Sequence, residues 1–398
     1  MYSHERRAVE SHLNSHSSGN IWDIRTNAAE KYRQWAKSYD GVFQIQLGNI
    51  PVVVVNTAAT AKAIFGQNSQ ALASRPEFYT FLVWPIDSST RKLVSDTSGT
   101  TIGSSPYSES LKRRRKGAAS ALNRPSVATY VQHLDVESKD FISELYTYGK
   151  AGNEPVYPMP MIQRLSLSLA LTLNWGTRMG SQKEDLFHEI THVEEEISRF
   201  RSTTGNLQDY IPLLRILPFN THSAKAKEMR KFYGDDKPVC DSENDQQCAY
   251  IVALDRESLR YYTVLRLALP KCSIRDVVYN GVTIPKGTVV FLNSWACNMD
   301  DETWSDPEVF RPERYLDRPE APMFTYGMGY RMCAGSLLAN RELYLVYMRL
   351  LNSFRVEKDD EIDSHPLTGN SDPTSLVAIR IAIAPFSCLA TRRHCRQL

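Results

Sequence analysis

The sequence lacks the features that mark membrane, secreted and nucleic-acid-binding proteins. It has no apolar run approaching the roughly 20 residues that cross a membrane, and its polar start, Met1 to Arg7, contains no signal-peptide core. The 47 basic and 45 acidic residues give a formal charge of +2, so the composition does not favour nucleic acid as a partner. There are seven cysteines, an odd number, and six show no metal-ligand spacing, which suits a reducing compartment better than a disulfide framework. We therefore expect an intracellular protein.

Linkers, repeats and low-complexity tracts are also missing, so we expect residues 1–398 to form a single domain that acts as a monomer. The patterning predicts an α+β fold, mostly α, with a small N-terminal β-rich lobe and a helical lobe. An Asn-Gly pair at 280–281 predicts a hairpin between residues 276 and 288. The β-rich part is expected at about 39–60 and 270–290, with strands at 41–48 and 51–56 and helices at 28–38, 57–66 and over much of about 109–235, including 160–174 and 183–200.

The most informative stretch is Tyr326–Gly335, a glycine-rich turn that leads through one cysteine into an apolar-periodic helix. Cys333 therefore lies at or just before a helix N-terminus, where free amides and the helix dipole favour a thiolate. Gly327 and Gly329 can adopt positive φ, and Gly335 has no side chain to keep a flat cofactor away. This arrangement suits an axial ligand of haem iron. The alternative is a buried structural cysteine after a turn.

This loop resembles the haem-ligand loop of the cytochrome P450 family, Phe-Gly-x-Gly-x-Arg-x-Cys-x-Gly. The sequence keeps every specified position except the first, where Tyr326 replaces Phe. The resemblance implies a haem-ligand loop at 324–335 and haem b as cofactor, with Cys333 as the iron's axial ligand. It also implies cofactor contacts from the other specified positions of the loop, which are Tyr326, Gly327, Gly329, Arg331 and Gly335.

Two upstream motifs follow in the order of that family. Glu257 and Arg260 are three residues apart and share a helical face, and Arg314 ends the segment Phe310–Arg314. The resemblance implies that these three residues form a buried charge network behind the cysteine loop. A bidentate Arg–carboxylate pair with a second Arg can be satisfied inside a protein. Taken alone, Glu-x-x-Arg is more often a surface helix pair.

A basic segment at 112–116 follows Leu111 and predicts a largely solvated helix face. In the family, the corresponding helix offers a Trp and, four residues on, an Arg to a haem propionate. Leu111 and Arg115 have that spacing, with Leu in place of Trp. Arg115 and Arg331 are therefore candidates for propionate binding, because a guanidinium matches a carboxylate bidentately. Lys271 stands where relatives place a further arginine.

Four segments narrow the resemblance to the fungal phenylacetate and hydroxyphenylacetate hydroxylases: 74–78, 101–107, 335–343 and 370–376. The resemblance implies a haem-thiolate monooxygenase that hydroxylates a small aromatic acid. It would use O₂ and electrons from a separate NADPH-dependent reductase. Such relatives are anchored to the endoplasmic reticulum membrane, but we find no anchor here, so a cytoplasmic or peripheral location is expected.

Two parts of the sequence depart from the family pattern. The helix that crosses the distal haem face, with its acid–alcohol pair, is expected before Glu257. The polar segment between Met229 and Asp255 has no apolar periodicity long enough for it, and the Asp96–Thr97 step is no substitute. The sequence after Ala378 does not resemble the family's C-terminal strands. The catalytic residues are thus not identified, and the alternative function is a catalytically impaired or non-catalytic haem-binding remnant of a truncated gene or gene model.

Overall fold

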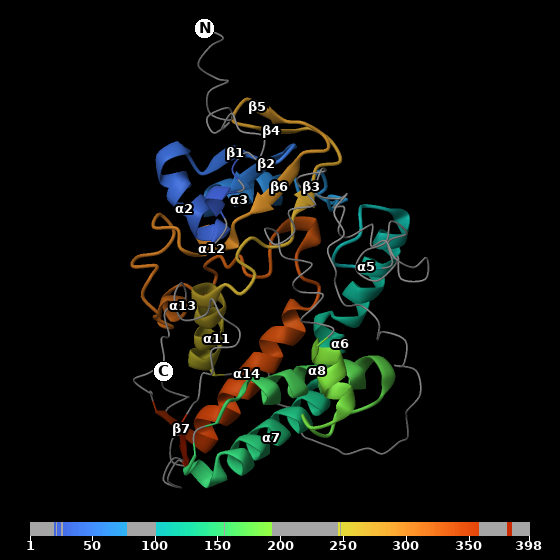
Figure 1. Ribbon diagram of the computed structural model, residues 1–398, viewed down its shortest axis with the longest axis vertical. Coiled ribbons are helices and arrows are strands. Elements are labelled where there is room, and N and C mark those ends of the chain that lie inside the picture. Colours follow the sequence, from blue (N-terminus) through green and yellow to red (C-terminus); the bar gives the residue numbers. More distant parts are fainter. Residues whose placement is uncertain are drawn as a thin grey trace.

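A four-stranded sheet forms the core of one end of the molecule. The computed structural model describes residues 20, 22–24, 27–77, 101–154, 156–192, 246, 248–357 and 380–383. The sheet order is β1-β2-β6-β3, so the N-terminal hairpin pairs with strands more than two hundred residues later (Figure 1). Strands β1 and β2 are antiparallel, whereas β2 and β6 are parallel. The strands are β1 (Val42–Leu47), β2 (Ile50–Val55), β3 (Lys271–Cys272) and β6 (Val289–Leu292).

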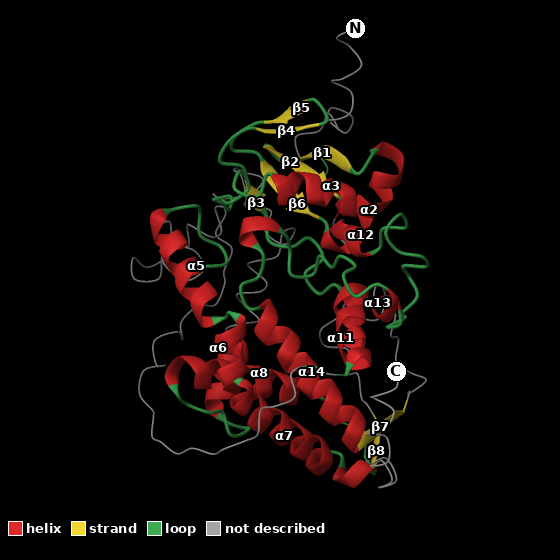
Figure 2. Ribbon diagram, turned by 180° about the vertical axis from the view of Figure 1, so that it is seen from behind, coloured by secondary structure: helices red, strands yellow, loops and turns green. Residues whose placement is uncertain are grey.

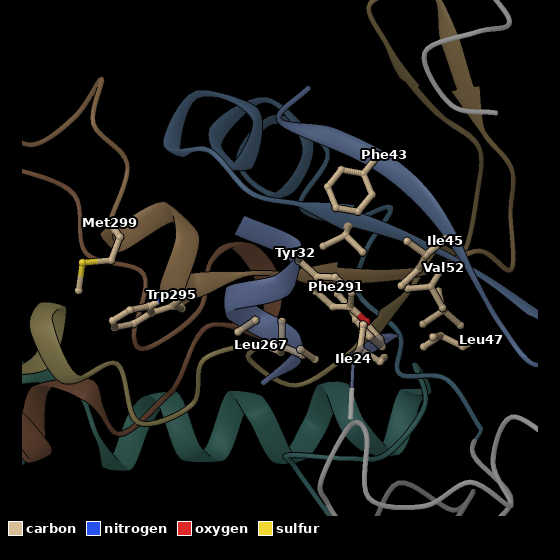
Figure 3. Close-up of a cluster of buried hydrophobic side chains, with 14 of the residues drawn as sticks. Ile24, Tyr32, Phe43, Ile45, Leu47, Val52, Leu267, Phe291, Trp295 and Met299 are labelled. Carbon is tan, nitrogen blue, oxygen red and sulfur yellow. The ribbon is translucent and has the colours of Figure 1, made fainter. Parts of the chain in front are cut away.

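Residue type explains why this sheet is central. Strand β2 carries four consecutive valines, all buried, and all four residues of β6 are buried. Continuous apolar strands of this kind are covered on both faces. One face carries Phe43, Ile45 and Phe291, which pack with Tyr32 and Trp295 from neighbouring helices (Figure 3). The other face packs against a second cluster that includes Ile64 and Phe65.

The predicted hairpin is confirmed at β4 (Val277–Tyr279) and β5 (Val282–Ile284). Asn280 and Gly281 have φ of 49° and 79°, the left-handed conformation that a two-residue hairpin turn requires at both central positions. Tyr279 and Val282, which flank the turn, lie directly opposite each other in the two strands. The local dipeptide signal was therefore sufficient to locate this element.

Helices make up most of the remaining described chain, and most of them lie at the end away from the sheet (Figure 2). Asn27 caps α2 by accepting a hydrogen bond from the Glu30 N–H. The helices are α2 (Ala28–Tyr39), α3 (Ala58–Ala61), α5 (Glu109–Ala121), α6 (Arg124–Thr129), α7 (Val131–Tyr148), α8 (Met159–Trp175), α11 (Ala249–Tyr262), α12 (Ser294–Asn298), α13 (Arg314–Asp317) and α14 (Ser336–Ser353). Short 3₁₀ or π turns are η1 (Trp22–Ile24), η2 (Lys62–Gln67), η3 (Lys150–Gly152) and η5 (Gly329–Arg331), and a small sheet pairs β7 (Phe354–Glu357) with β8 (Arg380–Ile383).

The α+β fold with a helical majority is therefore confirmed. The expected helices 28–38 and 160–174 correspond to α2 and α8, and the helix expected at 57–66 is α3 followed by the π turn η2. Residues 185–192 are helical, and the rest of the expected helix 183–200 lies outside the described residues. Within the described parts of the chain, no helix is long and apolar enough to cross a membrane.

Candidate haem-binding site

The cysteine loop connects the sheet end of the molecule to α14. Its turn is closed by backbone hydrogen bonds: the Gly327 N–H donates to the Phe324 carbonyl at 2.8 Å, and the Cys333 N–H donates to the Tyr326 carbonyl at 3.0 Å. Helix α14 begins at Ser336, so Cys333 precedes a helix N-terminus, as its sequence setting predicts. The Cys333 side chain is exposed. An exposed thiol at the positive end of a helix dipole is well placed to bind a metal as thiolate.

Each glycine of the loop is needed for a structural reason of its own. Gly327 and Gly329 have φ of 73° and 74°, a region in which other residues are strained. A Cβ at Gly329 would also lie 2.3 Å from the Phe65 carbonyl oxygen of η2, so no side chain fits there. At Gly335, a Cβ would lie 4.0 Å from the Cys333 sulfur. The absence of that Cβ leaves the surface beside the sulfur open to a flat cofactor.

Arg331 belongs to the loop and is buried, with only 5% of its surface exposed. Its guanidinium donates only to carbonyl oxygens among the described residues, at 3.0 to 3.2 Å, and its Nε has no partner among them. Burial, with a smaller contribution from the nearby Arg115, lowers the pKa of Arg331 to about 10. The accepting carbonyls belong to residues 73, 102, 103 and 105.

Two further cations are buried close to Arg331. Lys271 donates to the Met328 carbonyl at 2.6 Å, and Arg75 donates to the carbonyls of Leu269 and Pro270, directly before Lys271, at 2.6 and 2.8 Å. Burial is the largest cause that lowers the pKa of each well below its usual value, and mutual repulsion with Arg331 adds to it. Within the described chain, none of the three forms an ion pair with a carboxylate. We call Arg75, Lys271 and Arg331 the buried cation cluster.

Sequence reasoning named Arg331 and Lys271, but it gave Arg75 no role. Arg75 reaches Leu269 and Pro270, which are 194 and 195 residues away along the chain. A contact of that range leaves little trace in a single sequence. The available signal was an arginine two residues after the short apolar stretch 71–73, because an arginine drawn inside by such a stretch is rarely buried unless it is paired.

Arg115 comes to the same loop from α5. Its Nη2 donates to the Met332 carbonyl at 3.2 Å, and its guanidinium lies 5.5 Å from the centre of the Tyr330 ring. Leu111, one helical turn earlier, is fully buried, so it anchors α5 and directs Arg115 toward the loop. The structure therefore brings Arg115 and Arg331 together, as the resemblance implies.

Glu257, Arg260 and Arg314 form one ion-pair network with almost no exposed surface. The carboxylate of Glu257 accepts from Arg260 Nε and Nη2 at 2.7 and 2.8 Å, and from Arg314 Nε at 3.1 Å. It also accepts from the Arg311 backbone N–H at 2.8 Å. The guanidinium groups use their remaining donors on carbonyls, including those of residues 298, 307, 305, 306 and 309. This saturation is what makes a buried ionic cluster tolerable.

The network braces the cysteine loop through Asn298. Arg260 donates to the Asn298 carbonyl, while the Asn298 side chain accepts from the Phe324 N–H at 3.0 Å and donates to Thr325 Oγ1 at 3.2 Å. Thr325 in turn donates to the Leu259 carbonyl at 2.6 Å. The start of the loop is thus fixed to α11 and α12.

Asp255 is a second buried acid that sequence reasoning did not identify. Only 2% of its surface is exposed, and its Oδ1 has no hydrogen-bond partner among the described residues. Burial raises the pKa of Asp255 to about 7, and Arg256 opposes part of this rise. At neutral pH, the Asp255 carboxyl group is therefore protonated in roughly half of the molecules.

The residues around the loop fit a haem group. They offer an exposed thiol, an open surface above Gly335 and the buried cation cluster. Buried cations need anionic partners, and the two propionates of haem b would supply them. The segment between Met229 and Asp255, where the distal acid–alcohol pair is expected, lies outside the described residues except at 246 and 248–255, and so does the Asp96–Thr97 step.

Comparisons with known proteins agree with a haem-binding site at this loop. The family model for cytochrome P450 matches residues 16–236 and 222–378. The chain is 57% identical to a 3-hydroxyphenylacetate 6-hydroxylase of Emericella nidulans, over 91% of this chain and 85% of the relative. It is 33% identical to a phenylacetate 2-hydroxylase of the same organism, over 90% of this chain and 86% of the relative.

The alignments also show a difference in length. The first spans 447 positions, more than the 398 residues of this chain. Because the matched 91% of the chain is about 362 residues, about 85 aligned positions of the relative face no residue here. The family model matches in two pieces that meet at 222–236, which falls in the region where the distal helix was sought.

Proposed function

Because this chain belongs to the cytochrome P450 family, we propose that it is a haem-thiolate monooxygenase that hydroxylates a small aromatic acid such as phenylacetate or a hydroxyphenylacetate. In this reaction a ring C–H becomes C–OH with one atom of O₂. The other oxygen atom leaves as water, with two electrons from a reductase and two protons. The observation that carries the haem-thiolate part of the proposal is Cys333 at the start of α14 beside the buried cation cluster. The names of the two similar hydroxylases support the substrate class.

Each part of the site has a role in holding the cofactor. Haem b, when bound, supplies the iron chemistry that activates dioxygen. Cys333 would be the axial thiolate, with Gly327 and Gly329 shaping the turn that presents it. Arg115 and the buried cation cluster would pair with the propionates. Glu257, Arg260 and Arg314 would hold the loop in place without contacting the cofactor.

The remaining parts of the proposal concern partners and organisation. We propose an NADPH-dependent reductase as the source of electrons, since the chain belongs to a family that receives its electrons from a redox partner. We also propose that the polypeptide works as a single domain and a monomer. Analytical ultracentrifugation of the haem-loaded protein tests the last point, because a concentration-independent monomer mass is expected.

The ligand assignment is tested by spectroscopy. Reduced protein with carbon monoxide should show the absorption band of thiolate-ligated haem, and Cys333→Ser should abolish it because the alcohol is a poor ligand. Cys248→Ser is the matched control: Cys248 is a half-buried thiol at the N-cap of α11, where serine is favoured. A thiolate band that persists in Cys333→Ser would refute the assignment.

The length difference favours a second candidate function, a haem-binding protein with impaired catalysis. Dioxygen cleavage needs electron donation from the thiolate and protons delivered from the opposite face. If the roughly 85 missing positions include the distal helix, the chain keeps Cys333 but loses the acid–alcohol pair that would supply protons. Water would then enter the open side of the cofactor site. With reductase and NADPH, the 398-residue chain should then release mainly peroxide.

A restored variant separates the two candidates. Insertion of the distal segment that the relative has and this chain lacks should convert peroxide release into ring hydroxylation, measured as product formed per NADPH consumed. The control is an insertion of the same length and composition in scrambled order, which should leave peroxide as the main product. Efficient, coupled hydroxylation by the unmodified chain would exclude the impaired function.

A further inference from the structure

Tyr326 departs from the phenylalanine of the family pattern, and its hydroxyl group has a defined partner. Its backbone carbonyl accepts the Cys333 N–H at 3.0 Å. Its hydroxyl donates to Asn340 Oδ1 at 2.6 Å, and Asn340 lies on α14, which begins directly after the loop. One residue therefore holds the cysteine through its backbone and the following helix through its side chain.

The direction of this hydrogen bond is fixed by the surroundings of the phenol. Burial raises the pKa of Tyr326, and the negative groups of Asp255, Cys333 and Glu342 raise it further. The carboxamide oxygen of Asn340 can only accept, so the Tyr326 hydroxyl is the donor.

Asn340 is itself held in place by a second contact. Its backbone carbonyl accepts from Gln246 Nε2 at 3.2 Å. One turn further along α14, the Tyr344 hydroxyl accepts from the Cys248 N–H at 3.0 Å, at the start of α11. The acceptor of the Tyr326 hydroxyl is thus a fixed point where α14 meets the start of α11.

We propose that the Tyr326–Asn340 hydrogen bond is a latch between the cysteine loop and α14, and that Tyr326 is a positioning residue for Cys333. The proposal rests on the function proposed above. A phenylalanine at 326 would keep the half-buried ring and the backbone bond to Cys333, but it would remove the hydrogen bond that joins the loop to Asn340 of α14. The latch narrows the positions that the sulfur can take before the cofactor is bound.

The first experiment uses the apoprotein, in which Cys333 is an exposed thiol. Alkylation of Cys333 by iodoacetamide is followed by mass spectrometry of its peptide, for Tyr326→Phe, Asn340→Ala and the double variant. Because a neutral hydrogen bond contributes about 0.5–1.5 kcal/mol, each single variant should react about 2- to 12-fold faster. The double variant should react no faster than the quicker single variant. Additive single effects, or unchanged rates, would overturn the latch.

The second experiment uses the haem-loaded protein. Tyr326→Phe should shift the haem reduction potential, increase the fraction of reduced carbon monoxide complex that lacks the thiolate band, and speed haem transfer to apomyoglobin about 2- to 12-fold. Tyr146→Phe removes a half-exposed hydroxyl from α7 and should change none of them.

The outcomes distinguish the latch from the proposed function. If Tyr326→Phe matches the parent in alkylation, potential and haem transfer while Cys333→Ser loses the thiolate band, the latch is wrong and the ligand assignment stands. If Cys333→Ser keeps that band, the proposed function itself fails.

Discussion

Asp255 gives this protein a predictable dependence of stability on pH. It lies on α11, two residues before Glu257, but it does not join the arginine network. It faces the phenols of Tyr326 and Tyr347, whose pKa values it raises. With its Oδ1 lacking a partner in the described structure, the charged form of Asp255 is poorly solvated, and folding favours the protonated form.

The size of the effect follows from the two pKa values. The ordinary value is 3.8, and in the folded protein it is raised to about 7. Each pKa unit corresponds to about 1.4 kcal/mol, so the shift amounts to roughly 4 kcal/mol. Below the ordinary pKa, both folded and unfolded states are protonated. As the pH rises toward 7, the unfolded chain loses its proton while Asp255 keeps it, so the free energy of unfolding falls by up to roughly 4 kcal/mol and then levels off.

The substitution Asp255→Asn removes this titration and keeps the shape of the side chain. We expect the variant and the parent to differ little in urea unfolding near pH 4, while the variant becomes increasingly more stable up to about pH 7. Asp317→Asn, on the short helix α13, is the control. A stability difference between Asp255→Asn and the parent that stays constant from about pH 4 to 8 would refute the raised pKa.

Three further substitutions test the site. Glu257→Ala should lower the free energy of unfolding by about 3–5 kcal/mol, because it leaves two buried guanidinium groups without their carboxylate; soluble, haem-loaded protein at parental yield would contradict this. Gly329→Ala should yield little folded protein, because its Cβ would lie 2.3 Å from the Phe65 carbonyl, whereas Gly66→Ala, with nothing within 4 Å, should express normally. Lys271→Met should stabilise the apoprotein in urea yet release haem about tenfold faster, since it removes a buried charge that the propionates need; equal or slower haem release would contradict a propionate contact.

Local signals predicted the parts of the fold and site that depend on short stretches of sequence. The Asn-Gly turn and the glycines of the cysteine loop require particular backbone angles, so residue type alone identified them. The brace of Glu257, Arg260 and Arg314 was predicted only through the family's order of motifs, because each motif is commonplace in isolation. The structure shows that these three side chains do meet.

Arg75 and Asp255 could not be predicted in the same way. Their chemistry depends on burial, and their burial depends on segments distant in sequence: Arg75 contacts residues 269 and 270, and Asp255 lies near Tyr326 and Tyr347. A single sequence shows the charge of such a residue but not what surrounds it. The Tyr326 hydroxyl belongs with them, because only the fold reveals Asn340 as its acceptor.

Haem binding and oxygen chemistry depend on different parts of this chain, so they can be lost separately. The thiolate, the arginine brace and the buried cation cluster all lie in described segments between residues 73 and 340 that keep their mutual contacts. The two pieces of the family match overlap at 222–236, which lies outside the described residues. A chain without the distal helix would keep Cys333 and its supports, but it would lack the residues that cover the other face of the cofactor. A full thiolate band with peroxide as the main product is therefore the combination that the short chain should give, and coupled hydroxylation should require the added segment.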